Sequence, residues 1–261
     1  MRRSGFWGIV RCGLTLLVAA LSASAAIARI DRNVWRDGAI VRGDPDRRRI
    51  ALVFTAADWY DGADTIISTL KETHVKASFF FTGKFFEKHS DIILRLLKDD
   101  HYVSGHGYAH LLYADWSKRD STLISRNTFI NDLEKNYSLM ADIGLKRKRA
   151  RYFIPPYEHY NGTVAHWANE IGLQMINFTP GSGSNADYTV QSMINYKSSV
   201  QIFQNVLNYE TAHTLNGHFL LMHFGTHPDR VDKFYLLLPE LIKILRQRGY
   251  KFVKVNDMIE K

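Results

Sequence analysis

Short, continuous apolar runs alternate with amphipathic segments along most of this chain, and this alternation limits its fold more than any other feature. The run at 50–54 is apolar throughout, as expected for a strand that is buried on both faces of a sheet. Apolar residues spaced three and four apart follow it and predict a helix. The predicted strands are 50–54, 77–81, 102–103, 152–154, 173–178, 219–222 and 252–255, with helices around 66–70, 92–97, 130–140, 164–170 and 232–248.

No linker or repeat interrupts this series, so it predicts one parallel α/β domain with a barrel-like sheet. The length of 261 residues fits that reading, because single barrels commonly run to ~200 to 250 residues. Asn127 is the expected cap of the helix at 130–140, and Gly144 its expected stop. The segment 179–200 predicts a long loop, and long loops in compact domains are usually functional.

The first residues are predicted to lie outside this domain. Arg2 and Arg3 precede an apolar run at 14–21 and a string of small residues at 22–26, the pattern of a secretory signal peptide. The apolar run is much shorter than the ~20 residues that span a bilayer, so no stable membrane insertion is expected. We therefore predict a signal peptide at 1–28, a single domain at 29–261 and a secreted or periplasmic protein.

Cysteine and charge exclude several function classes. Cys12 is the only cysteine and falls in the predicted signal peptide, which excludes disulfides, thiolate metal ligands and cysteine nucleophiles from the mature domain. Any metal must then be held by histidine and carboxylate side chains. The chain is basic, with a net charge of +8, but it has no zinc-finger spacing or known nucleic-acid module, so no nucleic-acid partner is expected.

Polar residues suited to a metal site follow four of the predicted strands. His106 and His110, four positions apart, would lie on one side of a helical turn and reach one cation. With 11 histidines in the chain this pair alone is weak evidence. Asp58 and His223 follow two further strands, and a Pro-Pro-Tyr-Glu turn ending at Glu158 follows a fourth. Chemistry in parallel α/β folds sits at the carboxyl ends of strands, so these groups are expected to share one rim.

This ordered set of motifs resembles the polysaccharide deacetylases, the NodB-homology carbohydrate esterases of family four. The resemblance covers roughly residues 48–257 and includes the segment 76–83, similar to the family's second strand. Leu-Leu-Tyr at 111–113 and Asn-Ala-Asp-Tyr at 185–188 point to a subgroup. The resemblance to the family implies a distorted, incomplete (β/α) barrel of the NodB-homology type that binds Zn²⁺, or another divalent cation such as Co²⁺ or Ni²⁺. Such a protein hydrolyses N-acetyl or O-acetyl groups on a polysaccharide or oligosaccharide.

The family's residue roles carry over to matching positions. The resemblance implies a metal triad of Asp58, His106 and His110, with His223 as the general acid. It implies an oxyanion donor at the backbone amide of Trp59 and a cavity wall at Tyr157. Sugar contacts are further expected from side chains in the rim loops, each of which is also consistent with plain packing: Trp116, Asp187 and His227.

Three positions depart from the family pattern. Ala57 stands where the family has the aspartate that acts as base, and Ile154 stands where many members carry the arginine that orients this base. Gly107 replaces a serine or threonine that braces the metal loop. Glu158 is the best candidate for a substitute base, although a surface glutamate is an equally good interpretation. The sequence thus leaves open a deacetylase with a new base, a catalytically impaired protein that binds glycan or metal, and a metallohydrolase of another amide or ester.

Overall fold

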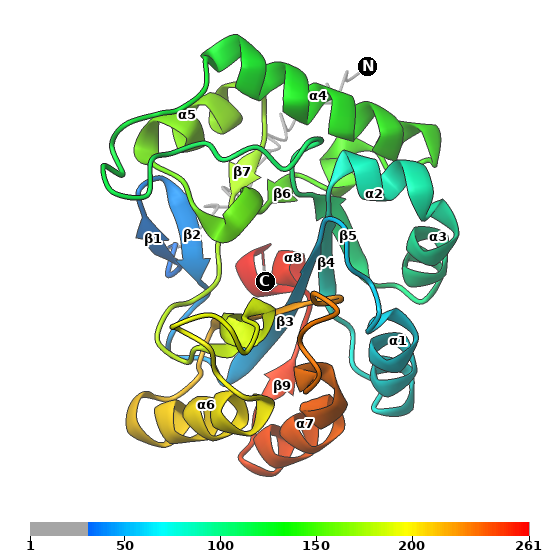
Figure 1. Ribbon diagram of the computed structural model, residues 1–261, viewed down its shortest axis with the longest axis vertical. Coiled ribbons are helices and arrows are strands. Elements are labelled where there is room, and N and C mark those ends of the chain that lie inside the picture. The colour runs from blue at the N-terminus through cyan, green and yellow to red at the C-terminus, as the bar shows by residue number, and fades with distance from the viewer. Residues whose placement is uncertain (1–30, 261) are drawn as a thin grey trace, which may run out of the picture. The chain divides into compact units, whose positions relative to one another are not determined.

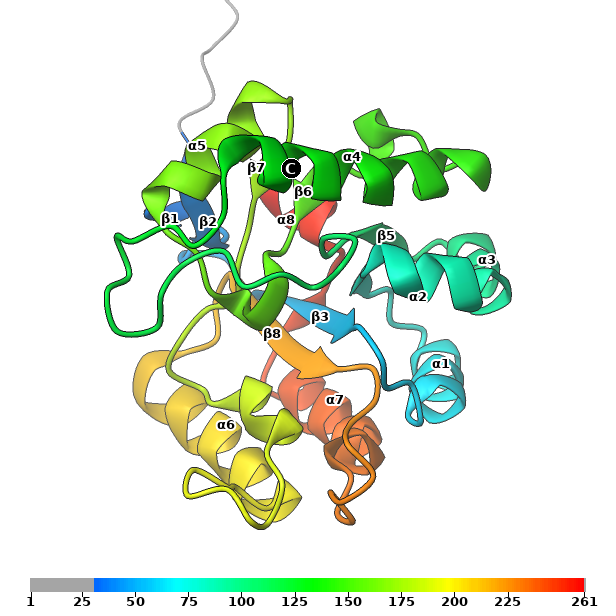
Figure 2. The same ribbon diagram turned by 45° about the horizontal axis from the view of Figure 1, so that its top comes forward.

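The strand β3 (Arg49–Ala56) is the centre of the structure, a computed structural model that describes residues 31–260. All of its residues except Arg49 are buried, which explains the uninterrupted apolar run. It pairs in parallel with β4 (Ser78–Phe81), β8 (His218–His223) and β9 (Lys251–Phe252), and β4 pairs in parallel with β5 (Tyr102–Gly105). Figure 2 shows β3 and β8 side by side, with their carboxyl ends at the same edge.

The sheet is not parallel throughout, and at this point the prediction was wrong. A hairpin of β1 (Val34–Arg36) and β2 (Ala39–Arg42) adds two antiparallel strands beyond β8. Its turn residues Asp37 and Gly38 both have positive φ, as a two-residue hairpin turn requires. A second, two-stranded sheet of β6 (Tyr152–Phe153) and β7 (Gln174–Met175) approaches β2 through a bridge between Ile40 and Ile176. The strands thus form the curled, incomplete barrel that the sequence predicts.

Helices surround the strands on several sides (Figure 1). They are α1 (Ala63–Glu72), α2 (Gly83–Lys88), α3 (Ser90–Lys98), α4 (Arg126–Asp142), α5 (Gly162–Glu170), α6 (Ser199–His213), α7 (Leu238–Gln247) and α8 (Val255–Glu260). Their apolar faces and the strands bury one large apolar core. This packing leaves the carboxyl ends of the strands available for a site.

Several local predictions differ from the structure. The cap of α4 is Ser125, whose side chain accepts a hydrogen bond from Thr128 N, and not Asn127. The predicted helix at 232–248 starts as α7 only at Leu238, after a short 3-10 helix at Phe234–Leu237. The predicted last strand is shorter, because Val255 begins α8. Helix α6 was not predicted, although Ser198 and Gln201 form a capping box at its start.

The predicted signal peptide at 1–28 lies outside the described residues. Among residues 31–260, no helix is both long and apolar enough to cross a membrane. Residues Arg32–Lys261 cluster as one unit.

Candidate functional site

The carboxyl ends of the central strands meet at one edge and form the floor of a cavity. Pairing places Thr55 of β3 opposite His223 of β8, and Phe81 of β4 opposite Gly105 of β5. The cavity at this edge has a volume of about 670 Å³. Most residues that the sequence assigned to the site line it: Asp58, Trp59, His106, His110, Trp116, Tyr157, Glu158 and His223, together with Ala57.

His106 and His110 lie close together, but not on a helical turn. Residues 106–110 form an irregular loop in which Gly107 and His110 both have positive φ, so the predicted helical turn was wrong. The ring centroids nevertheless lie 5.1 Å apart. His106 Nδ1 donates to the carbonyl oxygen of Ile154 at 2.9 Å, which leaves Nε2 as the free acceptor. Burial holds the pKa of His106 well below its usual value and lowers the pKa of His110 to about 4. Both rings are therefore neutral, the form that binds metals.

The loop that carries the two histidines is held by α4, which the sequence did not indicate. Asp132 accepts from Tyr108 N at 2.8 Å and from Ala109 N at 2.9 Å, and Asn136 Oδ1 accepts from His106 N at 3.2 Å. Both side chains are buried. A polar residue facing inward from a helix was the available signal. Asp132 thus braces the loop that lacks the family's hydroxyl at Gly107.

Restoring the family's hydroxyl at Gly107 is expected to destabilise the fold. Gly107 has φ +76, and a Cβ there would lie 2.8 Å from Tyr113 Oη and 2.9 Å from Asp132 Oδ2. The Gly107→Ser variant should lose about 2–4 kcal/mol in urea unfolding, from left-handed strain plus overpacking. Gly144→Ser is the matched control, because Gly144 has φ +83 with nothing within 4 Å of a Cβ. Equal losses in the two variants would contradict the crowding at Gly107.

Glu158 is not a surface glutamate. Its side chain is only 12% exposed, and its Oε1 lies 3.9 Å from His106 Nε2. Tyr157 and Glu158 both have positive φ, an unfavourable pair for residues with a Cβ. Asn177 fixes this turn by donating through Nδ2 to the Glu158 carbonyl oxygen at 2.7 Å. Burial, with the nearby charge of Asp187, raises the pKa of Glu158 above its usual value.

His223 is held from behind by Asp187. His223 Nδ1 donates to Asp187 Oδ1 at 2.7 Å, and the backbone amide of His223 donates to Asp187 Oδ2 at 2.8 Å. Burial alone would lower the pKa of His223, but the carboxylate of Asp187, together with that of Glu158, outweighs burial and raises the pKa above its usual value. The predicted sugar contact of Asp187 is therefore replaced in the structure by an orienting role, because both of its oxygens are engaged and its side chain is only 3% exposed.

Aromatic side chains frame the mouth of the cavity. Tyr157 lies 4.3 Å from His110 between ring centroids, and Trp116 stacks on His159 at 4.2 Å. Trp116 and Tyr157 line the cavity and are exposed, and exposed aromatic rings beside a cavity are suited to contact a sugar. His227 lies apart from this group, against Trp59 at 5.2 Å.

The donor chemistry of the rim fits a divalent cation in part. His106 and His110 present neutral imidazoles, and a carbonyl fixes the tautomer of His106, as is common for metal-bound histidine. Asp58 is exposed, and its charge raises the pKa of His110 against the stronger effect of burial. Within residues 31–260, however, no three His, Cys, Asp or Glu side chains converge closely enough to hold a metal ion. In place of the predicted triad, the structure thus has two neighbouring histidines with the carboxylate of Asp58 nearby.

Comparisons with known proteins point to one family. A family model described as polysaccharide deacetylase matches residues 42–176. A peptidoglycan-N-acetylglucosamine deacetylase of Bacillus cereus is 28% identical over 196 residues, covering 74% of this chain and 64% of that protein. The chain therefore spans a little less than two thirds of that relative's length.

Solved structures show the same fold at low identity. A family 4 carbohydrate esterase pseudoenzyme from Bacillus anthracis superposes with a TM-score of 0.68 at 19% identity, over 86% of this chain and 70% of that chain. The chitin deacetylase of Colletotrichum lindemuthianum superposes with a TM-score of 0.64 at 20% identity, over 87% of this chain and 93% of that chain. The motif order, the incomplete barrel and the family match agree, and the chain belongs to the polysaccharide deacetylase family, with the NodB-homology fold of the family 4 carbohydrate esterases.

Proposed function

We propose that this protein is a secreted or periplasmic, metal-dependent deacetylase that removes N-acetyl or O-acetyl groups from a polysaccharide, with Glu158 as its base. Zn²⁺, or Co²⁺ or Ni²⁺ in its place, would be held by Asp58, His106 and His110. Peptidoglycan is the first glycan to test, because curated relatives are peptidoglycan-N-acetylglucosamine deacetylases.

The observation that carries this proposal is that Glu158 and His223 line the same cavity. Glu158 is a carboxyl with little exposure beside the metal-site histidines, whereas His223 is an imidazole backed by a carboxylate. The pKa of each is raised, the first by burial and the second by Asp187 against burial. A base of raised pKa and an acid of raised pKa are what hydrolysis near neutral pH requires.

The chemistry follows from these positions. A bound dication supplies polarisation of the acetyl carbonyl and a lower pKa for water. Glu158 accepts a proton from the attacking water, whose oxygen bonds to the acetyl carbon. His223 donates its Nε2 proton to the departing amine nitrogen or alkoxide oxygen as the C–N or C–O bond breaks. The products are acetate and the free amine or hydroxyl of the glycan, and Asp187 keeps Nε2 directed into the cavity.

A catalytically impaired glycan- or metal-binding protein is the second candidate, and Ala57 favours it. The methyl group of Ala57 cannot accept a proton. The Bacillus anthracis relative is described as a pseudoenzyme, and a mutant of it as having restored enzymatic activity. The loss of a positioned base typically costs ~10² to 10⁴ in rate.

Acetate release separates the two candidates. The purified protein should contain a divalent cation and release acetate from acetylated chitooligosaccharides, acetylated xylan or peptidoglycan, and Ala57→Asp should change this rate by less than about tenfold, because Glu158 already supplies a base. If the parent releases no acetate while Ala57→Asp does so with the same metal content, the parent is not a working deacetylase. Full metal content in His106→Ala would overturn the ligand assignment.

A further inference from the structure

A second cavity opens beside the first, and His223 lines both. Its volume is about 390 Å³. The two cavities share Trp59, Tyr188, His223 and Gly225, so they meet at the general acid. The remaining residues of the second cavity are Val190, Met193, Thr226, His227 and Asp229. Nothing in the deacetylation of an acetyl group needs this much additional space.

The lining of the second cavity suits an apolar group better than a sugar. Val190 is 7% exposed, whereas Trp59, Tyr188 and Met193 are 44%, 43% and 42% exposed. Three large apolar side chains of the cavity lining are therefore partly exposed to solvent. Exposed apolar side chains that gather at a concave site indicate an apolar ligand. The polar groups are less available. Thr226 is buried with its amide donating to Asp61 and its hydroxyl accepting from Lys233, and the Asp229 side chain is 74% exposed at the rim.

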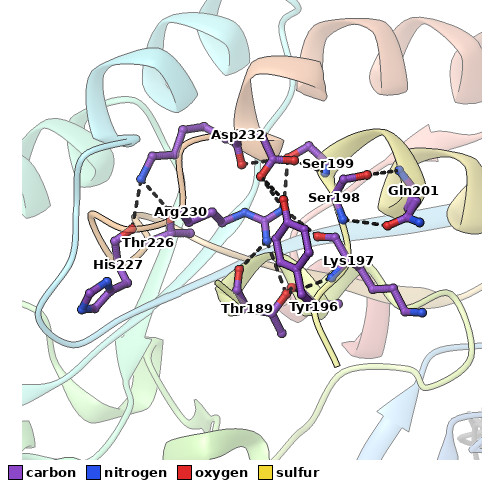
Figure 3. A network of polar contacts seen from close by, with 12 residues as sticks. Thr189, Tyr196, Lys197, Ser198, Ser199, Gln201, Thr226, His227, Arg230 and Asp232 are labelled. Atoms are coloured by element: carbon purple, nitrogen blue, oxygen red, sulfur yellow. Dashed lines mark hydrogen bonds and ion pairs between the residues drawn. The ribbon is translucent and has the colours of Figure 1, made fainter. Parts of the chain in front are cut away.

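One wall of the cavity is held by a fully buried arginine. Arg230 is 0% exposed. It donates to the carbonyl oxygens of Thr189 at 2.6 Å and Lys197 at 3.0 Å, which stand just before and just after the segment that contains Val190 and Met193 (Figure 3). The guanidinium also lies 3.6 Å from Asp232 and 5.4 Å from the centre of the Tyr196 ring. Both ends of this segment are therefore fixed to the loop that follows β8.

The opposite wall is fixed as well. Lys233 Nζ donates to Thr226 Oγ1 at 2.9 Å and to the His227 carbonyl oxygen at 3.3 Å, and it pairs with Asp61 at 2.9 Å. His227 then packs against Trp59 with the rings 5.2 Å apart. Both walls of the cavity are thus held by contacts within the fold, as in the largely preformed sites of small molecules.

We propose that the second cavity binds the acyl chain of the substrate, and that the protein removes, besides acetyl, longer acyl groups of about four to six carbons. This inference rests on the proposed hydrolase function. The exposed rings of Trp116 and Tyr157 on the first cavity receive the sugar, which leaves the second cavity for the group on the other side of the scissile bond. Water supplies the oxygen that bonds to the acyl carbon, and the C–N or C–O bond breaks. A fatty acid leaves, and His223 protonates the amine or alkoxide.

The test compares p-nitrophenyl acetate, butyrate and hexanoate with the full, metal-loaded protein. Each buried methylene favours binding about three- to fourfold, so kcat/KM should rise at least about tenfold from acetate to butyrate or hexanoate, after correction for spontaneous hydrolysis. Sodium hexanoate should also bind at least about tenfold more tightly than sodium acetate, measured by tryptophan fluorescence, because Trp59 lines both cavities.

Two neighbouring substitutions locate the effect. Met193→Asp places a charge in the cavity and should lower hexanoate turnover by at least about tenfold, with a much smaller change for acetate. Ile194→Asp is the matched control, since Ile194 is fully exposed and does not line the cavity, and both esters should be hydrolysed as before. Equal effects of the two substitutions would argue against the second cavity.

Different results would overturn the acyl-binding cavity and the proposed hydrolase function. Hydrolysis that declines steadily from acetate to hexanoate, with hexanoate binding no more tightly than acetate, overturns the acyl cavity and leaves a deacetylase. Tighter hexanoate binding without turnover of any ester or glycan supports the acyl-binding cavity and overturns the proposed hydrolase function. Binding of chitotriose that Met193→Asp abolishes, with no preference for hexanoate, assigns the cavity to a sugar and overturns the inference.

Discussion

The Glu158→Gln variant is expected to lose ~10² to 10⁴ in kcat for acetate release, because an amide cannot accept the proton of the attacking water. The exchange keeps the size of the side chain and the backbone turn that Asn177 holds, so the thermal unfolding temperature should stay within a few degrees of the parent. Glu240→Gln is the control, because Glu240 is an exposed glutamate on α7 that pairs with Lys243 and does not line the cavity. It should change neither quantity.

Metal content decides what a loss of activity in Glu158→Gln means. Glu158 Oε1 lies 3.9 Å from His106 Nε2, close enough for the carboxylate to act as a ligand instead of a base. A base leaves metal content unchanged when it is replaced, whereas a ligand does not. If metal content is unchanged and turnover is lost, Glu158 acts as the base. If metal content is lost, Glu158 is a metal ligand. A rate in Glu158→Gln equal to the parent's would exclude both roles. Adding Ala57→Asp to Glu158→Gln should restore part of the rate, because a carboxylate then returns to the rim.

The strands and the shared rim were predictable because each depends on a local pattern. Apolar runs specify buried strands such as β3 and β8, and parallel strands must end at one edge. The residues after each run, among them His106 and His223, then meet without any further information. The confirmed half-barrel and family membership follow from the same patterns.

What the sequence did not predict depends on contacts between distant segments. Asp132 braces the histidine loop from α4, and Asp187 reaches His223 from a loop 36 residues away. The motif at 185–188 contains Asp187 without indicating its partner, and an inward-facing polar residue on a helix does not indicate which loop Asp132 contacts. The pair His106 and His110 was placed on a helical turn because the spacing of four is helical, but Gly107 with φ +76 directs the chain into a loop. Only the tertiary contacts of that loop bring the two rings together.

The Asp187→Asn variant is expected to lower kcat by about 10²-fold or more, through His223 and not through substrate contact. Asp187 accepts from both Nδ1 and the backbone amide of His223, so it sets the tautomer and the direction of the ring together. An asparagine amide supplies one acceptor in place of two and carries no charge. The ring can then turn, and the imidazolium, which has a proton on both Nδ1 and Nε2, loses the carboxylate that stabilises it. KM should change less than kcat, because Asp187 is buried behind the ring.

The pH profile provides the sharper test, because its direction follows from the charge that is removed. A general acid must be protonated, and Asp187 raises the pKa of His223 against the effect of burial, which extends activity to higher pH. Without the carboxylate of Asp187, only Glu158 still opposes burial and the pKa of His223 falls, so the alkaline limb of kcat/KM should move to lower pH. Asp64→Asn, which removes an exposed carboxylate paired with Arg95, should leave the limb in place. A lower kcat with an unmoved alkaline limb would mean that Asp187 only holds the loop, and that another group donates the proton.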